Sequence, residues 1–330
     1  MIRKPRKRKY DAVDGVESDN NNSDVSEDEC ACEDYHFSPD ELKGYQIFFI
    51  SGAKGSGKTH LTTYLMSQRY KEYDEVHLYS GTSVSQPNAW RFIPNIHKHN
   101  GLDLTDLTER LKRQEERVSE EFEKLTREPG FDGWDDDTVR DKINKKVPHV
   151  CIILDDIISD PRIRSSNVIK DIFISCRHLR VSFYILVQCP AKGASVSNLM
   201  RENVDYCFAA RSRTVDSLEA LAMLYFSSQG VGEGMRRVSK ITSSKHAFAV
   251  SKCCGDRTTK LRGYTCRYKC PKTIPKFTLK STKEMMRMFN VKTMRELNHA
   301  ASGDTRLRPA ERAKTKKGKK RKRKLVIEFG

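Results

Sequence analysis

The chain has 330 residues, of which 37% are hydrophobic and 32% are charged, and its formal net charge at pH 7 is +17. This length suits one large α/β domain with appendages, while the low apolar content indicates that part of the chain lies outside a packed core. The charge indicates a polyanionic partner or, as the alternative, serves solubility. No signal peptide or long apolar span is present, which argues against a membrane or secreted protein and predicts that the ten cysteines are reduced inside a cell.

Residues 1–43 are predicted to be a disordered tail. They open with the basic cluster Arg3 to Lys9 and continue into the acidic run Asp11 to Glu41, whose few apolar residues cannot offset the entropy of ordering. The basic cluster is interpreted as a nuclear-import address, with nucleic-acid contact as the alternative.

A glycine-rich loop follows the apolar run Phe48 to Ile50 and reads GAKGSGKT, which fits the pattern strand, G-x-x-x-x-G-K-[ST], helix. Its glycines allow backbone N–H groups to turn toward one anion, which the N-terminus of the next helix also faces. Lys58 is expected to reach phosphate oxygens and the Thr59 hydroxyl to ligate Mg²⁺. The loop therefore predicts a nucleoside-triphosphate site formed by Gly52, Ala53, Lys54, Gly55, Ser56, Gly57, Lys58, Thr59 and His60.

A second strand, Glu75 to Ser80, completes a βαβ pattern and predicts a parallel sheet. Farther along, Leu104, Leu111, Val118 and Leu125 recur seven residues apart, which predicts an amphipathic helix that ends at Pro129-Gly130. We interpret it as a packing helix, with a coiled-coil contact to another subunit as the alternative.

Two acidic residues, Asp155 and Asp156, follow the apolar strand Val150 to Leu154. A strand of this kind is typical of the centre of a parallel sheet, whose carboxyl edge holds ligands. Asp155 is predicted to hold Mg²⁺ through water, and Asp156 to orient or deprotonate the attacking water.

A helix from Ser165 to His178 leads to another buried strand, Val181 to Val187, which ends on Gln188. The Gln188 amide is predicted to contact the γ-phosphate or the attacking water, with an ordinary loop hydrogen bond as the alternative. A strand, Val204 to Ala210, and a helix, Val215 to Phe226, complete this part of the chain.

Four segments, in this order, carry a resemblance to a known family: GAKGSGKT, IILDDI, SCRHLRVSFYILVQ and LMRENVDYCFAAR. The series resembles the genome-packaging ATPases of poxviruses and other large DNA viruses, within the superfamily of the DNA pumps FtsK and HerA. The similarity extends from Tyr45 to Phe226 and more loosely to Tyr268. It implies ATP and Mg²⁺ as cofactors, and double-stranded DNA, capsid or procapsid proteins and a homo-oligomeric ring as partners.

The resemblance also assigns roles residue by residue. Lys58 corresponds to the Walker lysine, Asp155 to the Mg²⁺-binding acid, Asp156 to the catalytic acid and Gln188 to the sensor glutamine. Many relatives have Glu where this chain has Asp156. A cation from a neighbouring subunit is also expected at the γ-phosphate. Arg201, which the resemblance places near the subunit boundary, is the first candidate, and Arg177 and Arg211 are the alternatives.

Residues 251–302 are predicted to form a hairpin and a helix after an ATPase domain at 44–250. Strand-like runs at Ala247 to Val250 and Leu261 to Tyr268 flank a turn, and a single helix is expected from Thr282 to Ala300. The cysteines nearby lack a C-x₂-C knuckle, so we interpret them as hairpin residues rather than zinc ligands: Cys253, Cys254, Cys266 and Cys270. Residues 303–330 are predicted to be a disordered basic tail.

The sequence thus predicts an α/β fold with an additional-strand, mostly parallel P-loop sheet flanked by helices. The predicted function is an ATP-hydrolysing motor that packages viral double-stranded DNA into capsids, inside the cell and in the host nucleus, with association with the virion as a further location. The alternatives are a helicase-like remodelling ATPase, a non-hydrolysing nucleotide-dependent scaffold and a small-molecule kinase. The paired acids and Gln188 argue against the scaffold.

Overall fold

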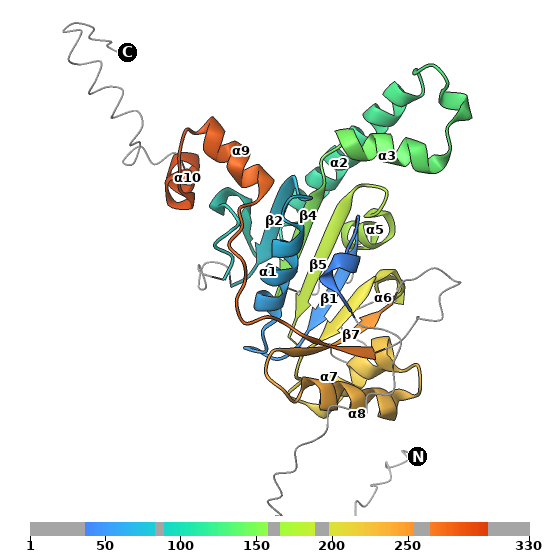
Figure 1. Ribbon diagram of the computed structural model, residues 1–330, viewed down its shortest axis with the longest axis vertical. Helices are drawn as coiled ribbons and strands as arrows, with labels where there is room; N and C mark the ends of the chain where they lie inside the picture. The colour runs from blue at the N-terminus through green and yellow to red at the C-terminus, as the bar shows by residue number, and fades with distance from the viewer. Residues whose placement is uncertain (1–36, 83–88, 158–165, 189–197, 254–264, 303–330) are drawn as a thin grey trace, which may run out of the picture. The chain divides into compact units, whose positions relative to one another are not determined.

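An eight-stranded, mostly parallel sheet lies at the centre of the computed structural model (Figure 1). The structure describes residues 37–82, 89–157, 166–188, 198–253 and 265–302, with only the backbone for Asn198, Leu199 and Arg201. All of these belong to one unit, Asp34–Gly330, whereas a second unit, Met1–Glu33, lies outside the described residues.

The strands follow the order β3-β2-β4-β5-β1-β6-β7-β8. Neighbours from β3 to β6 are parallel, and β7 and β8 extend that edge as an antiparallel hairpin. Strand β5 lies between β1 and β4, and the mostly parallel sheet flanked by helices is the predicted fold. The strands are β1 (Ile47–Ser51), β2 (Glu75–Ser80), β3 (Lys98–Asn100), β4 (Val150–Asp155), β5 (Val181–Val187), β6 (Tyr206–Ala209), β7 (Ala247–Lys252) and β8 (Thr265–Lys269).

Helices cover both faces of the sheet, which explains why the central strands are continuous apolar runs. In β1 the side chains alternate between two cores, with Phe49 in one and Phe48 in the other. Helix α1 packs on the Phe48 side, and α2, α5, α7 and α8 pack on the Phe49 side. The helices are α1 (Lys58–Arg69), α2 (Leu104–Leu125), α3 (Asp136–Lys146), α5 (Asn167–Ser175), α6 (Asn198–Asn203), α7 (Val215–Leu221), α8 (Val231–Thr242), α9 (Lys280–Met288) and α10 (Met294–Ala301).

Helices α2 and α3 form a hairpin that extends away from the sheet (Figure 1). Leu107 and Leu111, in the first three turns of α2, pack into the core, as the packing-helix interpretation predicted. Farther out, Phe122 is 44% exposed and lies 5.9 Å from the ring of Phe131. Helix α2 ends at Leu125, before the predicted stop at Pro129, and α3 was not predicted, because its sequence has only two apolar residues, Val139 and Ile143.

The predicted hairpin near the C-terminus is present as β7 and β8, and it is part of the main sheet. The domain boundary at residue 250 stays a prediction, although β7 continues across it to Lys252. The single helix predicted from Thr282 to Ala300 is wrong, because the structure has two helices, α9 and α10. Asn290 adopts a positive φ of 53°, and the Thr293 and Glu296 side chains form a capping box that starts a new helix.

The predicted tails at 1–43 and 303–330 lie almost entirely outside the described residues; of them, only 37–43 are described. Phe37 and Leu42, at the end of the first predicted tail, are buried in the core on the α1 side. Within the described part of the chain, no helix is both long enough and apolar enough to cross a membrane.

Candidate nucleotide-binding site

The glycine-rich loop lies between the end of β1 and the start of α1 and is anchored to two neighbouring strands. The Gly52 N–H donates to the Val187 carbonyl at 3.1 Å, and the Ala53 N–H donates to the Arg211 carbonyl at 3.1 Å. A Cβ at Gly52 would lie 2.6 Å from the Ala210 Cβ, so a larger residue cannot fit there. Gly57, with φ of 98°, turns the chain into α1. Strand, glycine loop and helix are therefore all in place. The loop is a P-loop.

Lys58 begins α1 and points its ammonium group back into the P-loop. Its Nζ donates to the carbonyls of Gly52 at 2.9 Å and Ala53 at 3.3 Å, and the residue is 7% exposed. Burial lowers the pKa of Lys58, while Asp156 and Asp155 raise it. The P-loop mouth thus holds a buried cation next to two acids.

Asp155 is the last residue of β4 and is buried. Its Oδ2 accepts hydrogen bonds from the Trp90 indole Nε1 at 3.0 Å and from the Ser80 hydroxyl at 3.4 Å. Burial is the largest cause of its raised pKa, and the bond from Trp90 opposes that rise. A cation beside this carboxylate would therefore stabilise its charged form.

Asp156 and Gln188 come from neighbouring strand ends and are joined directly. The Gln188 Nε2 donates to the Asp156 Oδ2 at 2.6 Å. Asp156 has a φ of 56°, and its other carboxylate oxygen, Oδ1, is buried without a hydrogen-bond partner among the described residues. A non-glycine residue in this backbone region costs free energy, so the surrounding structure holds this carboxylate in place.

The residues at this edge fit a magnesium ion. The Thr59 hydroxyl and the Asp155 carboxylate supply oxygen atoms, the ligand type that Mg²⁺ prefers. Thr59 is half-buried at the start of α1, and Asp155 is a buried acid that forms no ion pair with a cation among the described residues.

The other predicted P-loop residues surround this centre. Lys54 and Gly55 are exposed at the tip of the loop, and the Lys54 carbonyl lies 3.5 Å from the Arg213 Nη2. The Ser56 Oγ is buried without a partner among the described residues. His60 turns outward, where its Nε2 lies 2.7 Å from the Pro271 carbonyl oxygen.

The candidate arginines are not gathered at this edge. The Arg177 Nη2 forms an ion pair of 2.6 Å with the Asp205 Oδ1, at the amino edge of the sheet and therefore opposite the P-loop of the same chain. Arg201 lies in α6, which leads into the amino end of β6, and only its backbone is described. Arg211 contacts the P-loop through its backbone carbonyl. A role for any of them at a neighbouring site stays a prediction.

The cysteines near the hairpin do not gather into a metal centre in the described part of the chain. No group of three potential metal ligands is present among the residues that the structure places, which include Cys253, Cys266 and Cys270. Cys254 lies outside these residues.

Sequence reasoning missed two side chains of this site. Ser80 pairs in register with Asp155 across β2 and β4, so the predicted parallel sheet could have indicated it. Trp90 lies 65 residues before Asp155, after the loop that follows β2, and nothing in its local sequence indicates that it contacts the acid.

Comparisons with known proteins find similarity to several proteins of solved structure. No protein-family model matches the chain, and no curated protein does. The structure is similar to the genome packaging NTPase B204 from Sulfolobus turreted icosahedral virus 2 in complex with AMP, with a TM-score of 0.40 and 11% identity over 64% of this chain and 94% of that one.

It is also similar to the pCW3 conjugation coupling protein TcpA with ATPγS, with a TM-score of 0.47 and 12% identity over 77% of this chain and 64% of that one. A third likeness is to ATPases 2 and 3 of EssC from Geobacillus thermodenitrificans, with a TM-score of 0.46 and 11% identity over 77% and 44% of the two chains. All three TM-scores are below 0.5, so we base the function on the side chains of this chain.

Proposed function

We propose that this protein is a P-loop ATPase that translocates double-stranded DNA, and that it works as a homo-oligomeric ring which packages a viral genome into capsids. The hydrolytic part is carried by one observation, the convergence of four side chains from four elements at the carboxyl edge of the sheet. Lys58 comes from α1, Asp155 from β4, Asp156 from the turn after β4, and Gln188 from the end of β5. Carboxyl edges of parallel sheets are where such folds hold ligands.

Triphosphate binding is a task for the P-loop. Its backbone N–H groups and the start of α1 face an anion, and the Lys58 ammonium is free to exchange the carbonyls of Gly52 and Ala53 for phosphate oxygens. Thr59 and Asp155 would hold Mg²⁺. When bound, this ion neutralises charge on the β- and γ-phosphate oxygens.

Hydrolysis needs a group that acts on water. The Asp156 Oδ1 can accept a hydrogen bond from the attacking water, because no described residue already occupies it. The Gln188 amide holds Oδ2 and so fixes the orientation of the carboxylate. A non-hydrolysing scaffold would have no need of an oriented acid whose second oxygen has no hydrogen-bond partner among the described residues.

The DNA part of the proposal is supported by charge and by motif order. The net charge of +17 includes the basic run from Lys314 to Lys324, and such runs bind phosphate backbones through counterion release. The packaging role, the capsid partner and the nuclear location are proposed from the resemblance of the four motifs to viral packaging ATPases.

The deciding experiment is ATP turnover with and without double-stranded DNA, with Asp156→Asn as the inactive control. We expect strong stimulation by DNA, together with displacement of a bound third strand as the motor advances along an intact duplex. Unwinding of a forked duplex would indicate the helicase-like alternative. Turnover that DNA leaves unchanged would contradict the motor.

The basic tail allows a separate test of DNA contact. Deletion of Lys314 to Lys324 should weaken DNA binding and leave basal ATP turnover unchanged. If roughly six of its charges meet phosphates, the slope of log affinity against log salt should become shallower by about five. An unchanged slope with lost nuclear accumulation would identify the tail as an import address.

A further inference from the structure

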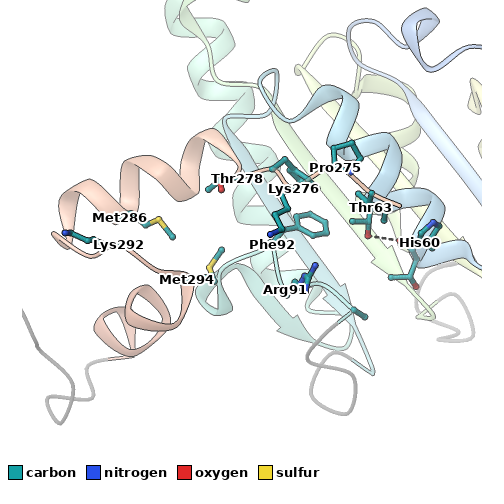
Figure 2. Close-up of a pocket in the computed structure, with 14 residues that line it drawn as sticks. His60, Thr63, Arg91, Phe92, Pro275, Lys276, Thr278, Met286, Lys292 and Met294 are labelled. Carbon is teal, nitrogen blue, oxygen red and sulfur yellow. Dashed lines mark hydrogen bonds between the residues drawn. The ribbon is translucent and has the colours of Figure 1, made fainter. Parts of the chain in front are cut away.

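A pocket of about 770 Å³ opens directly beside the P-loop (Figure 2). Helix α1 contributes Thr59, His60 and Thr63 to one side of it. Thr59 is also the residue that follows the P-loop lysine, so the pocket begins where the phosphate site ends. The remaining walls come from the loop after β2, from the segment between β8 and α9, and from α9 and α10.

Aromatic rings and thioethers form the apolar walls of the pocket. Phe92 and Phe277 contact each other with ring centroids 4.9 Å apart, at an interplanar angle of 47°. Figure 2 shows Met286 of α9 and Met294 of α10 on the opposite side from His60 and Thr63. Flat, polarizable surfaces of this kind favour a planar aromatic ligand.

The charged residues of the pocket are all cations. Arg91, Lys276 and Lys292 line it and are exposed, and no aspartate or glutamate is among the lining residues. The pocket therefore suits a ligand that has a planar apolar part and an anionic part.

We propose that this pocket receives the base and ribose of the nucleotide whose phosphates occupy the P-loop, which rests on the proposed nucleotide binding. A nucleoside triphosphate has both chemical parts, and the shared residue Thr59 makes the two sites continuous. The base lies among Phe92, Phe277 and the two methionines. Arg91 and Lys276 face the ribose and phosphates, whereas Lys292 lies beside Met286 on the side away from His60 (Figure 2). The volume lies within the range of ordinary ligand pockets.

A DNA backbone phosphate is the competing occupant. It would use the same cations but would gain nothing from the methionine and phenylalanine walls, and a duplex needs an open groove rather than a pocket bounded on several sides. The nucleoside therefore accounts for the apolar residues as well as the charges, whereas the phosphate accounts for the charges alone.

This assignment gives α9 and α10 a part in nucleotide recognition, although they follow the sheet in sequence. The chain reaches them by running from β8 past α1, where the Pro271 carbonyl meets His60 (Figure 1). A base bound in the pocket would contact α9 and α10, so the positions of these helices would depend on whether the P-loop holds a nucleotide.

The test compares the affinity of the full-length protein for ATP with its affinity for inorganic tripolyphosphate, which has the phosphates and lacks the nucleoside. Phe277→Ala removes a stacking surface, and Phe289→Ala is the matched control, because Phe289 is 42% exposed and does not line the pocket. We expect Phe277→Ala to weaken ATP binding on the order of ten- to a hundredfold. Tripolyphosphate binding should change less than about twofold, and Phe289→Ala should leave both affinities unchanged.

A second pair of variants shows whether a loss of affinity comes from the pocket or from local misfolding around Phe277. Met294→Ala alters the opposite wall, and Met288→Ala is its control, since Met288 is 76% exposed on α9 and lies outside the pocket. If both pocket variants bind ATP normally, or weaken ATP and tripolyphosphate equally, the proposal is overturned. A loss of DNA affinity with normal ATP affinity would overturn it in favour of the phosphate contact. A wild-type protein that binds neither ATP nor tripolyphosphate would instead refute the proposed function.

Discussion

The two edges of the central sheet differ in whether their polar and charged groups have hydrogen-bond partners. At the carboxyl edge, three buried oxygens have no hydrogen-bond partner among the described residues, namely Ser51 Oγ, Ser56 Oγ and Asp156 Oδ1. At the amino edge, the charged side chains of Asp74, Arg180 and Asp205 all have hydrogen-bond or ion-pair partners. Buried polar groups are normally satisfied, so unpaired ones indicate either strain or a missing ligand.

Asp205 and Arg180 show how complete the pairing is at the amino edge. Asp205 accepts the Ile47 N–H at 2.8 Å and pairs with Arg177 at 2.6 Å. Arg180 donates to the Tyr45 hydroxyl at 2.6 Å and to the Ile143 carbonyl at 3.0 Å. The comparison suggests that the amino edge stabilises the fold, while the carboxyl edge keeps groups vacant for ligands. Four predictions test this division, beginning with the largest effect.

Changes at the carboxyl edge should remove function and spare the fold. Lys58→Ala should abolish nucleotide binding, because the ammonium contacts ground-state phosphates. Asp156→Asn should retain nucleotide affinity and lose turnover by about a thousandfold, because only the carboxylate can accept a proton from water. Equilibrium nucleotide binding and steady-state hydrolysis measure the two effects separately. Normal hydrolysis by Asp156→Asn would show that it is not the general base.

The next prediction concerns an arginine of one subunit that would act at the carboxyl edge of its neighbour. Arg201→Ala should lower turnover on the order of a thousandfold with nucleotide affinity little changed. Mixing this variant with Lys58→Ala subunits should restore part of the activity, since an intact site can then borrow the arginine of its neighbour. No recovery at any ratio in assembled rings would transfer the role to Arg177, whose own substitution is otherwise expected to lower stability through loss of the Asp205 pair.

Asp205→Ala should destabilise the fold by about 2–4 kcal/mol, because it removes the acceptor of the buried Ile47 N–H and breaks the ion pair with Arg177. Urea unfolding measures this loss, and nucleotide affinity should be retained. Asp137→Ala is the matched control, since Asp137 is 84% exposed in its pair with Arg140 and should contribute less than about 0.5 kcal/mol. If both variants lose the same stability, the amino edge has no special structural role.

His149 predicts the smallest effect, a pH dependence of stability. Burial, together with the nearby charges of Arg69 and Arg180, lowers its pKa to about 3. The folded state therefore keeps His149 neutral, whereas the unfolded chain takes up a proton below about pH 6.5, so stability is full above that pH and falls below it. As the pH falls from 6.5 to 4.5, His149→Gln should reduce the pH slope of the unfolding free energy by an amount that grows to about 1.4 kcal/mol per pH unit. Parallel slopes for the two proteins would contradict a neutral buried histidine.

Much of this architecture could be predicted from the sequence, because strands buried on both faces are continuous apolar runs. β1, β4 and β5 are of this kind, and the polar residues that end them mark the carboxyl edge. Strand β3 could not be found in this way, since Lys98–Asn100 has no apolar residue.

Other parts of the structure could not be predicted from the sequence, because the residue at a position serves a contact that exists only in the folded protein. Helix α8 contains Gly232 and Gly234, which lower helix propensity. A Cβ at Gly234 would lie only 2.3 Å from the Phe226 carbonyl oxygen, so glycine serves the packing of α8 against the preceding π-helical turn, Ala222–Phe226. Trp90 is a similar case, because its indole N–H is required only once the chain has brought Asp155 beside it.

The anchoring of the P-loop has a kinetic consequence. The N–H groups of Gly52 and Ala53 are bonded to the carbonyls of Val187 and Arg211, so the ends of two strands hold the loop before any nucleotide arrives. Little conformational entropy remains to be lost on binding. Nucleotide association should therefore proceed in a single fast phase whose rate rises linearly with nucleotide concentration, and differences in affinity among P-loop variants should be found mainly in the dissociation rate.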